Sequence, residues 1–168
     1  MAIAAVCSMP TTEPAPSTTA IRDRFLADHH RLDALLSKLS AAFEANDPED
    51  VAKLWTDFES GLLAHLEAEE ATMIPALLRA CARDARVIVQ EHRHIRSRLA
   101  ELGVAVDLHT IRLDTARDFI DELFAHAENE DRLLYRWADG HLGEPERVSA
   151  LSELAARFRA RRKIAAAR

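Results

Sequence analysis

The sequence predicts an all-α fold, an up-down-up-down bundle of four long helices with an extra C-terminal helix. Its 168 residues include only 4 glycines, 6 prolines and 5% aromatic residues, and the abundant Ala, Leu, Arg and Glu lose little conformational freedom in a helix. Apolar residues recur with a period of about 3.6 along four long segments. Because short polar connections join these segments, neighbouring helices should be antiparallel, as in a four-helix bundle.

The first predicted helix begins near Ala20. It follows residues 1–19, which are rich in proline and show no apolar periodicity, and we expect a disordered N-terminal tail there. The apolar stripe of this helix ends before Asp47, which is a good N-cap for a second helix with Pro48 at its first position. Pro75 is expected to kink this second helix or to end it.

The third apolar stripe covers residues 88–102, after a predicted connection at 81–84, and Gly103 is a candidate C-cap or local break. The fourth stripe covers residues 115–137. A final helix begins at Glu144 and should pack outside the bundle or against a neighbouring subunit. The expected organisation is the tail at 1–19, the four-helix bundle at 20–143 and the C-terminal helix with a basic tail at 144–168.

The charge and hydropathy of the chain narrow the classes of partner. A net charge of -6 argues against nucleic acid as the main partner. No apolar run approaches the roughly 20 residues that span a bilayer, and the first residues lack the positive region of a secretory signal. We therefore expect no membrane association and a cytoplasmic location. Cys7 and Cys81 form no CxxC pair, which argues against a thiolate zinc site.

Two segments of the chain share the same chemical outline. His65 is followed four residues later by Glu69, and His126 is followed four residues later by Glu130. On a helix this spacing puts both side chains on one face, one turn apart. An imidazole nitrogen and a carboxylate aimed at the same point are ligands for a divalent transition metal.

Two more histidines, His29 and His92, lie on the apolar stripes of the first and third helices. His29 and His65 are each 18 residues from Asp47, so an antiparallel hairpin brings them level, since a helix rises about 1.5 Å per residue. The segments that start at Asp28 and Glu91 also align, which indicates a duplicated helical hairpin. The predicted metal ligands are His29, His65 and Glu69 from the first hairpin and His92, His126 and Glu130 from the second.

Two of these ligands have rivals next to them in the sequence. A rotation of the first helix would exchange His29 with His30, and the alignment with His92 favours His29. Asp131 is the alternative to Glu130. The other polar or aromatic candidates are expected to pack in the core or to face solvent: Tyr135, Trp137, Glu70, His94, His109 and His141.

The type and number of donors indicate the metal. Four imidazoles and two carboxylates exceed the needs of one tetrahedral zinc ion. Two metal ions bridged by the glutamates, each with two histidines, use all six donors and leave open positions. We expect two iron ions, with manganese or zinc as substitutes. In the alternative, a structural bundle with incidental histidines, two buried glutamates would lack a basic partner on their own stripes, which is costly.

Four segments together resemble the hemerythrin-like, HHE cation-binding family: Asp28–Asp33, His65–Glu70, Glu91–Ile95 and His126–Asp131. The resemblance covers residues 20 to 140 approximately. It implies a four-helix bundle with a non-haem di-iron centre that has histidine ligands and carboxylate bridges. It also implies a bridging oxo or hydroxo ligand and an open position for dioxygen, peroxide or nitric oxide.

Two positions differ from the oxygen-carrying members, which use a further histidine where this chain has Arg96 and an aspartate that corresponds to Asp131. The chain is closer to a four-histidine, two-glutamate branch that includes iron-centre repair proteins. We therefore expect a di-iron protein that binds, senses or handles oxygen, nitric oxide, peroxide or iron. The alternatives are an enzyme that decomposes peroxide or reduces nitric oxide, and a repair protein. The expected partner is a small diatomic or peroxide ligand, together with a second copy of the chain or another protein.

Overall fold

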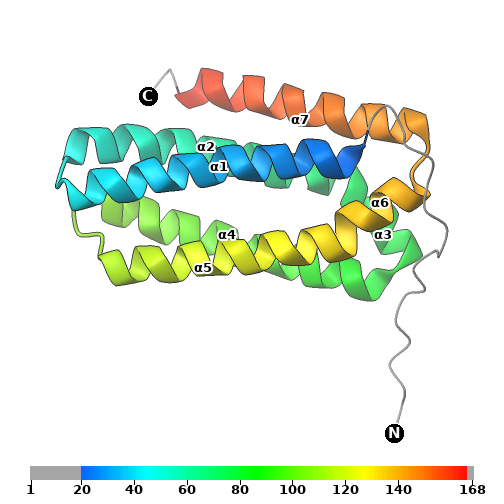
Figure 1. Cartoon of the computed structure of the whole chain (residues 1–168), viewed down its shortest axis with the longest axis horizontal. Helices are drawn as coiled ribbons and strands as arrows, with labels where there is room; N and C mark the ends of the chain where they lie inside the picture. Colours follow the sequence, from blue (N-terminus) through cyan, green and yellow to red (C-terminus); the bar gives the residue numbers. More distant parts are fainter. Residues whose placement is uncertain (1–19, 166–168) are drawn as a thin grey trace, which may run out of the picture.

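The computed structural model describes residues 20–165, and within this range the chain forms helices and no strand (Figure 1). The predicted tail at residues 1–19 lies outside the described residues. The predicted all-α fold is confirmed: four long helical segments run side by side, and a further helix lies along the outside. None of the helices in the described range has the length and apolar character that a membrane crossing requires.

The first hairpin consists of α1 (Ile21–Glu44) and α2 (Pro48–Ala71). Between them, Asn46 has a left-handed φ of 53°, a conformation that asparagine tolerates in tight turns. The side chain of Asp47 accepts a hydrogen bond from the backbone N–H of Asp50 at 3.1 Å, which confirms the predicted N-cap. The hairpin therefore turns where the apolar pattern predicted.

The second segment is kinked, as expected from Pro75. α2 ends at Ala71, Thr72 has non-helical dihedral angles, and α3 (Met73–Ala80) continues at an angle. Proline has no N–H and its ring clashes with the carbonyl of the residue four positions earlier, which is Ala71. The break therefore lies three residues before the proline.

The second hairpin starts with α4 (Ala82–Asp107), which only Cys81 separates from α3. The predicted connection at 81–84 is thus shorter than expected. The predicted break at Gly103 is wrong, because α4 continues through it and ends at Asp107. Val106, one turn after Gly103, is 3% exposed and packs in the core, so burial of this last turn maintains the helix.

The fourth long segment consists of three elements in sequence. α5 (Leu113–Glu130) continues into a π-helical turn, η1 (Asp131–Tyr135), and then into α6 (Arg136–His141). The amphipathic pattern did not predict the π turn. Because a π turn has i→i+5 hydrogen bonds, it changes which side chains share a face with those of α5.

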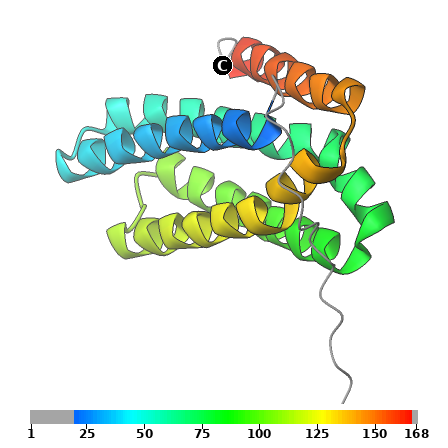
Figure 2. The same ribbon diagram turned by 45° about the vertical axis from the view of Figure 1, so that its right-hand side comes forward.

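α7 (Glu144–Ala165) is the extra C-terminal helix. It lies along the outside of α2 and also touches α1 (Figures 1 and 2). Ala150 and Leu154 are buried in this contact, and Arg161 forms an ion pair with Glu67 of α2. Of the two positions expected for this helix, the structure shows packing on its own bundle.

Two separate apolar clusters fill the bundle. One includes Phe25 and Leu77, and the other includes Phe58 and Leu99. Between the clusters, each of the four long segments contributes buried polar side chains. Such a layer is costly unless its members are partnered.

Candidate metal centre

The structure brings all six predicted ligands together in this polar layer. His65 is 1% exposed, and Glu69, His92 and Glu130 are 0% exposed. His29, with a side chain that is 12% exposed, is the most accessible member. The contributing elements are α1 for His29, α2 for His65 and Glu69, α4 for His92, and α5 for His126 and Glu130.

One half of the centre is formed by His29 and His65. Their Nε2 atoms lie 3.0 Å apart. The Nε2 atom of His29 is 3.1 Å from Oε2 of Glu130, and that of His65 is 3.5 Å from Oε1 of Glu69. Two imidazoles and one oxygen from each carboxylate therefore surround one point.

The other half is formed by His92 and His126. The Nε2 atom of His92 is 3.1 Å from Oε1 of Glu130 and 3.4 Å from Oε2 of Glu69. The Nε2 atom of His126 is 2.8 Å from Oε1 of Glu130. Each carboxylate thus directs one oxygen to each histidine pair, which is the arrangement of a bridge between two metal sites.

Three of the four histidines have a carboxylate on their outward nitrogen. The Nδ1 atom of His65 is 2.8 Å from Asp28. Likewise, the Nδ1 atom of His92 is 3.0 Å from Glu70 and that of His126 is 2.9 Å from Glu91. A carboxylate on one ring nitrogen fixes the tautomer and leaves the other nitrogen free to bind a metal. The Nδ1 atom of His29 is buried and has no hydrogen-bond partner among the described residues.

The sequence interpretation missed these carboxylates. Glu70 was expected to face solvent, but it accepts hydrogen bonds from both His92 and Arg96, the latter at 2.8 Å. Asp28 and Glu91 precede His29 and His92 in the sequence, yet each contacts the histidine on the next helix. An acid directly precedes the first histidine in both copies of the repeat. This recurrence could have indicated that the acids hold ligand histidines.

The rival ligands lie away from the centre. His30 is exposed. Asp131 forms ion pairs with Arg22 at 2.5 Å and with Arg136 at 3.0 Å. The structure therefore places His29 and Glu130, rather than their sequence neighbours, in the cluster.

Tyr135 is a further member of the centre that the sequence interpretation assigned to core packing. Its hydroxyl lies 2.6 Å from Oε1 of Glu69 and 3.0 Å from Oε2 of Glu130. It also lies 3.2 Å from the Nε2 atoms of His29 and His65. A phenol carries one proton, so it donates to one of these carboxylates at a time.

The π turn explains why Tyr135 was missed. In a regular α-helix, a residue five positions after Glu130 is rotated by about 140° from it. The i→i+5 geometry of η1 brings Tyr135 back to the face that carries His126 and Glu130. One signal in the sequence could have indicated this role, because the hydroxyl of a buried tyrosine needs a hydrogen-bond partner.

The family model of the hemerythrin HHE cation-binding domain matches residues 20–138 and, a second time, residues 83–165. The chain belongs to the hemerythrin family. The second match begins in α4, the helix that the internal repeat aligns with α1, and this agrees with a duplicated hairpin. No curated protein and no solved structure matches the chain.

The donors of this hemerythrin-type centre fit a metal. Two groups can each hold an ion, one formed by His29, His65 and Glu130 and the other by His92, His126 and Glu130. Two ligand atoms about 2.1 Å from one ion and at right angles to each other are about 3 Å apart, as are the Nε2 atoms of the first pair. Oε2 of Glu69 and Nε2 of His126 are buried and aimed at the centre, and in the described chain neither has a neighbour in hydrogen-bonding geometry, although His92 and Glu130 lie close to them.

Protons compensate the charges of this hemerythrin-type centre in its metal-free form. Burial opposes charging of His92, but the nearby Glu130, Glu69 and Glu70 outweigh it and raise the pKa of His92 to about 11. Burial likewise opposes charging of His126, and Glu130 and Glu91 raise its pKa to about 9. For Glu130, burial opposes ionisation, but the histidines hold its pKa well below the ordinary value. A metal ion would take the place of the protons on the Nε2 atoms.

A small cavity of about 30 Å³ adjoins the hemerythrin-type centre. Its polar wall includes His29, His65, His126 and Glu130, and its other wall consists mainly of leucine side chains together with Phe58. This volume exceeds the roughly 10–15 Å³ that one water molecule needs. The centre is therefore next to a mostly apolar space for a ligand of two or three atoms.

Proposed function

We propose that the six side chains bind two iron ions and that the protein binds or senses a small ligand, either dioxygen, nitric oxide or peroxide. The observation that carries the proposal is that Glu69 and Glu130 each direct one oxygen to each histidine pair. Imidazole and carboxylate donors suit iron, and manganese or zinc would be substitutes. A bridging oxo or hydroxo ligand would complete the pair.

The side chains of the protein have distinct roles in this proposal. The histidine pairs are terminal ligands, and the two glutamates are bridges. Asp28, Glu70 and Glu91 fix the orientation of three imidazoles, which raises ligand basicity. When bound, iron supplies redox chemistry and an open coordination position.

The cavity supports a small ligand rather than a larger organic substrate. Its volume of about 30 Å³ admits only a few atoms. Leu36, Phe58 and Leu62 on its wall offer no hydrogen bonds, so a diatomic ligand loses little when it leaves water for this space. His29 is the partly exposed ligand on this side of the centre, and we place the entry of the small ligand there.

A second candidate is a di-iron oxidoreductase that decomposes peroxide or reduces nitric oxide. Tyr135 favours it, because its hydroxyl is a proton donor within 3.2 Å of both histidines of the first pair. General acids positioned in this way contribute to proton transfer in enzymes. The same hydroxyl would stabilise a bound ligand in a protein that performs no turnover.

Rapid mixing of the reduced, iron-loaded protein with dioxygen, nitric oxide or peroxide separates these functions. A stable stoichiometric adduct in the optical spectrum supports binding or sensing, and multiple turnovers support the enzyme. No spectral change with any of the three ligands contradicts both. Glu69→Ala and His126→Ala should lower iron content sharply, whereas His141→Ala, at an exposed position on α6, should retain it.

A further inference from the structure

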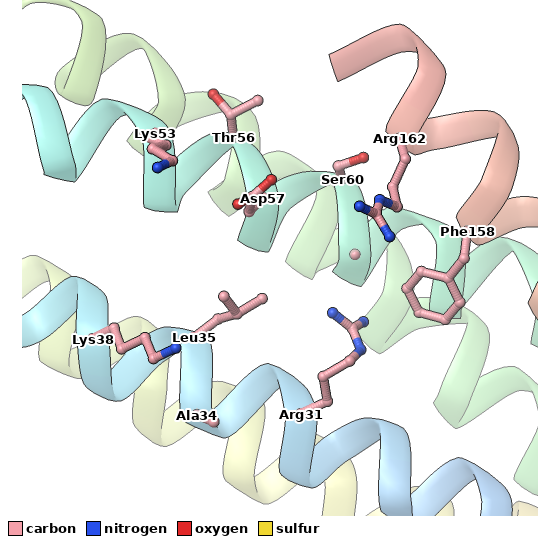
Figure 3. Close-up of a pocket in the computed structure, with 11 residues that line it drawn as sticks. Arg31, Ala34, Leu35, Lys38, Lys53, Thr56, Asp57, Ser60, Phe158 and Arg162 are labelled. Atoms are coloured by element: carbon pink, nitrogen blue, oxygen red, sulfur yellow. The ribbon is translucent and has the colours of Figure 1, made fainter. Parts of the chain in front are cut away.

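A basic pocket lies outside the metal centre, where α7 crosses α1 and α2 (Figure 3). Its volume of about 700 Å³ is within the range of small-molecule sites, about 300–1,000 Å³. The charged side chains that line it are Arg31 and Lys38 from α1, Lys53 and Asp57 from α2, and Arg162 from α7. Three helices therefore bring four cations and one carboxylate to a single concave surface.

The positive charge of the basic pocket is poorly compensated. The chain as a whole has a net charge of -6, so the charge of this cluster of four cations is opposite in sign to that of the whole chain. Arg31 forms an ion pair with Asp28, but Lys38, Lys53 and Arg162 form none with any carboxylate in the part of the chain described here. Cations held close together repel each other, and an anion in the pocket would relieve this repulsion.

Arg31 is held in position on three sides. Its Nε donates a hydrogen bond to Asp28 at 2.8 Å, and its guanidinium carbon lies 4.4 Å from the ring centroid of Phe158. The guanidinium also covers Gly61, where a Cβ atom would come within 2.9 Å of Nη2. The absence of a side chain at Gly61 inside α2 thus makes room for this arginine. A fixed planar fork loses little entropy when it binds an anion.

Arg31 faces a second arginine across the basic pocket. Figure 3 shows Arg31 and Arg162 extending toward one another from α1 and α7, with Ser60 on the α2 wall nearby. Two guanidinium groups with a hydroxyl donor on the same pocket wall are suited to phosphate oxygens, which accept several charge-assisted hydrogen bonds at once. The two lysines further along the pocket add point charges.

Two hydrogen bonds connect this pocket to the metal centre. Arg31 donates to Oδ1 of Asp28, and Oδ2 of Asp28 is 2.8 Å from Nδ1 of His65. An anion bound to Arg31 would compete with Asp28 for the guanidinium. A changed hydrogen bond on Nδ1 alters the donor strength of the opposite nitrogen of the same ring.

We propose that the basic pocket binds a small phosphate-bearing molecule through Arg31, Arg162 and the two lysines, and that occupancy alters the metal centre through Asp28 and His65. The second part rests on the proposed iron centre. The first part concerns side chains that do not contact that centre. The pocket is thereby a regulatory site for a phosphorylated metabolite.

Isothermal titration of the purified full-length protein with inorganic phosphate tests the site. We expect one site per chain with a dissociation constant below about 1 mM at low salt. Arg162→Gln and Lys53→Gln should each weaken binding by about tenfold or more, since each removes a charged partner. Lys163→Gln, an exposed neighbour on α7, is the matched control and should change affinity less than about twofold. No binding up to about 10 mM, or equal affinity in Arg162→Gln, overturns the proposal.

The coupling is read from the optical spectrum of the iron-loaded protein during the same titration. The wild type should show a spectral change that follows pocket occupancy, and Arg162→Gln should lose it. A change that persists in Arg162→Gln would mean that phosphate reaches the iron directly, which contradicts the coupling. Phosphate binding by a chain that binds no iron refutes the proposed function alone, whereas iron loading without phosphate binding refutes the pocket alone.

Discussion

The two hairpins of the bundle supply equivalent residues to the centre, and they hold their second histidines in the same way. In the first hairpin, Asp28 accepts from Nδ1 of His65, and in the second, Glu91 accepts from Nδ1 of His126. Each acid directly precedes the first histidine of its own hairpin in the sequence. The duplication therefore includes the supporting carboxylates as well as the ligands.

The first histidines of the two hairpins are held differently. Glu70, which follows Glu69, accepts from Nδ1 of His92. Its equivalent after Glu130 is Asp131, which begins the π turn and pairs with Arg22 and Arg136. His29 is thereby left without a partner on Nδ1 in the described residues.

The hydroxyl of Tyr135 contacts both histidines of the first half, and no hydroxyl among residues 20–165 makes the equivalent contact with both histidines of the second. The same π turn that begins at Asp131 brings the hydroxyl of Tyr135 within 3.2 Å of His29 and His65. The His29 half is thus less constrained and partly accessible, whereas both histidines of the other half have a carboxylate on Nδ1. We infer that the second half holds its metal rigidly and that the exogenous ligand enters on the side of His29.

Replacing Glu130, one of the two glutamates shared by both halves, should have the largest effect. Glu130→Ala removes one oxygen from each half, so both metal ions should be lost together, leaving less than about 0.2 metal ions per chain. Metal analysis after iron supplementation measures this. A variant that retains one full equivalent would show that the halves bind metal independently.

Changes of pH should affect the metal-free protein strongly and the loaded protein weakly. The raised pKa of His126, about 9, means that its stabilising contribution is complete below the unfolded value of about 6.5 and is lost as pH rises through 9. The expected loss from His126 is about 3 kcal/mol of unfolding free energy, and His92, with a pKa of about 11, adds a loss of the same sign over this range. Denaturant unfolding at pH 6 and 9 measures it. In the loaded protein, metal replaces the proton, and an equally steep decline there would contradict the assignment.

Replacing a carboxylate that holds a ligand histidine should reduce metal affinity by an intermediate amount. Glu91→Gln leaves His126 with a weaker partner on Nδ1, and metal affinity should fall by about 10–100-fold. Competition with a chelator of known affinity measures the change. Glu122→Gln is the control, because this carboxylate lies on α5 like His126 but pairs with His94 and Arg98. Equal losses in both variants would indicate a general charge effect.

Tyr135→Phe should have the smallest effect on metal content and a selective effect on the His29 half. The variant keeps the ring in the core but leaves Glu69 without its donor at 2.6 Å, at a cost of about 1–3 kcal/mol in the metal-free protein. Thermal unfolding measures this cost. Ligand binding to the loaded protein should weaken while iron content stays unchanged, and unaltered ligand binding would refute the role of this hydroxyl.

Most of the centre could be predicted because helix periodicity is regular over the parts that carry it. His65 and Glu69 are four residues apart, and His29 and His65 are equally far from the turn at Asp47. Both relations place the ligands correctly as long as the helices are undistorted. Tyr135 could not be placed, because the π turn changes the phase of the helix and no turn residue in the sequence indicates it. The supporting acids were missed because each contacts a helix other than its own, a relation that depends on packing rather than on spacing.

The iron content of the full-length protein, purified after iron supplementation and without chelator, tests the central claim most directly. If Glu69 and Glu130 bridge two histidine pairs, metal analysis should find about two iron ions per chain. One ion per chain would contradict the shared dinuclear centre. Less than about 0.2 ions per chain would mean that the buried histidines and glutamates compensate each other with protons alone.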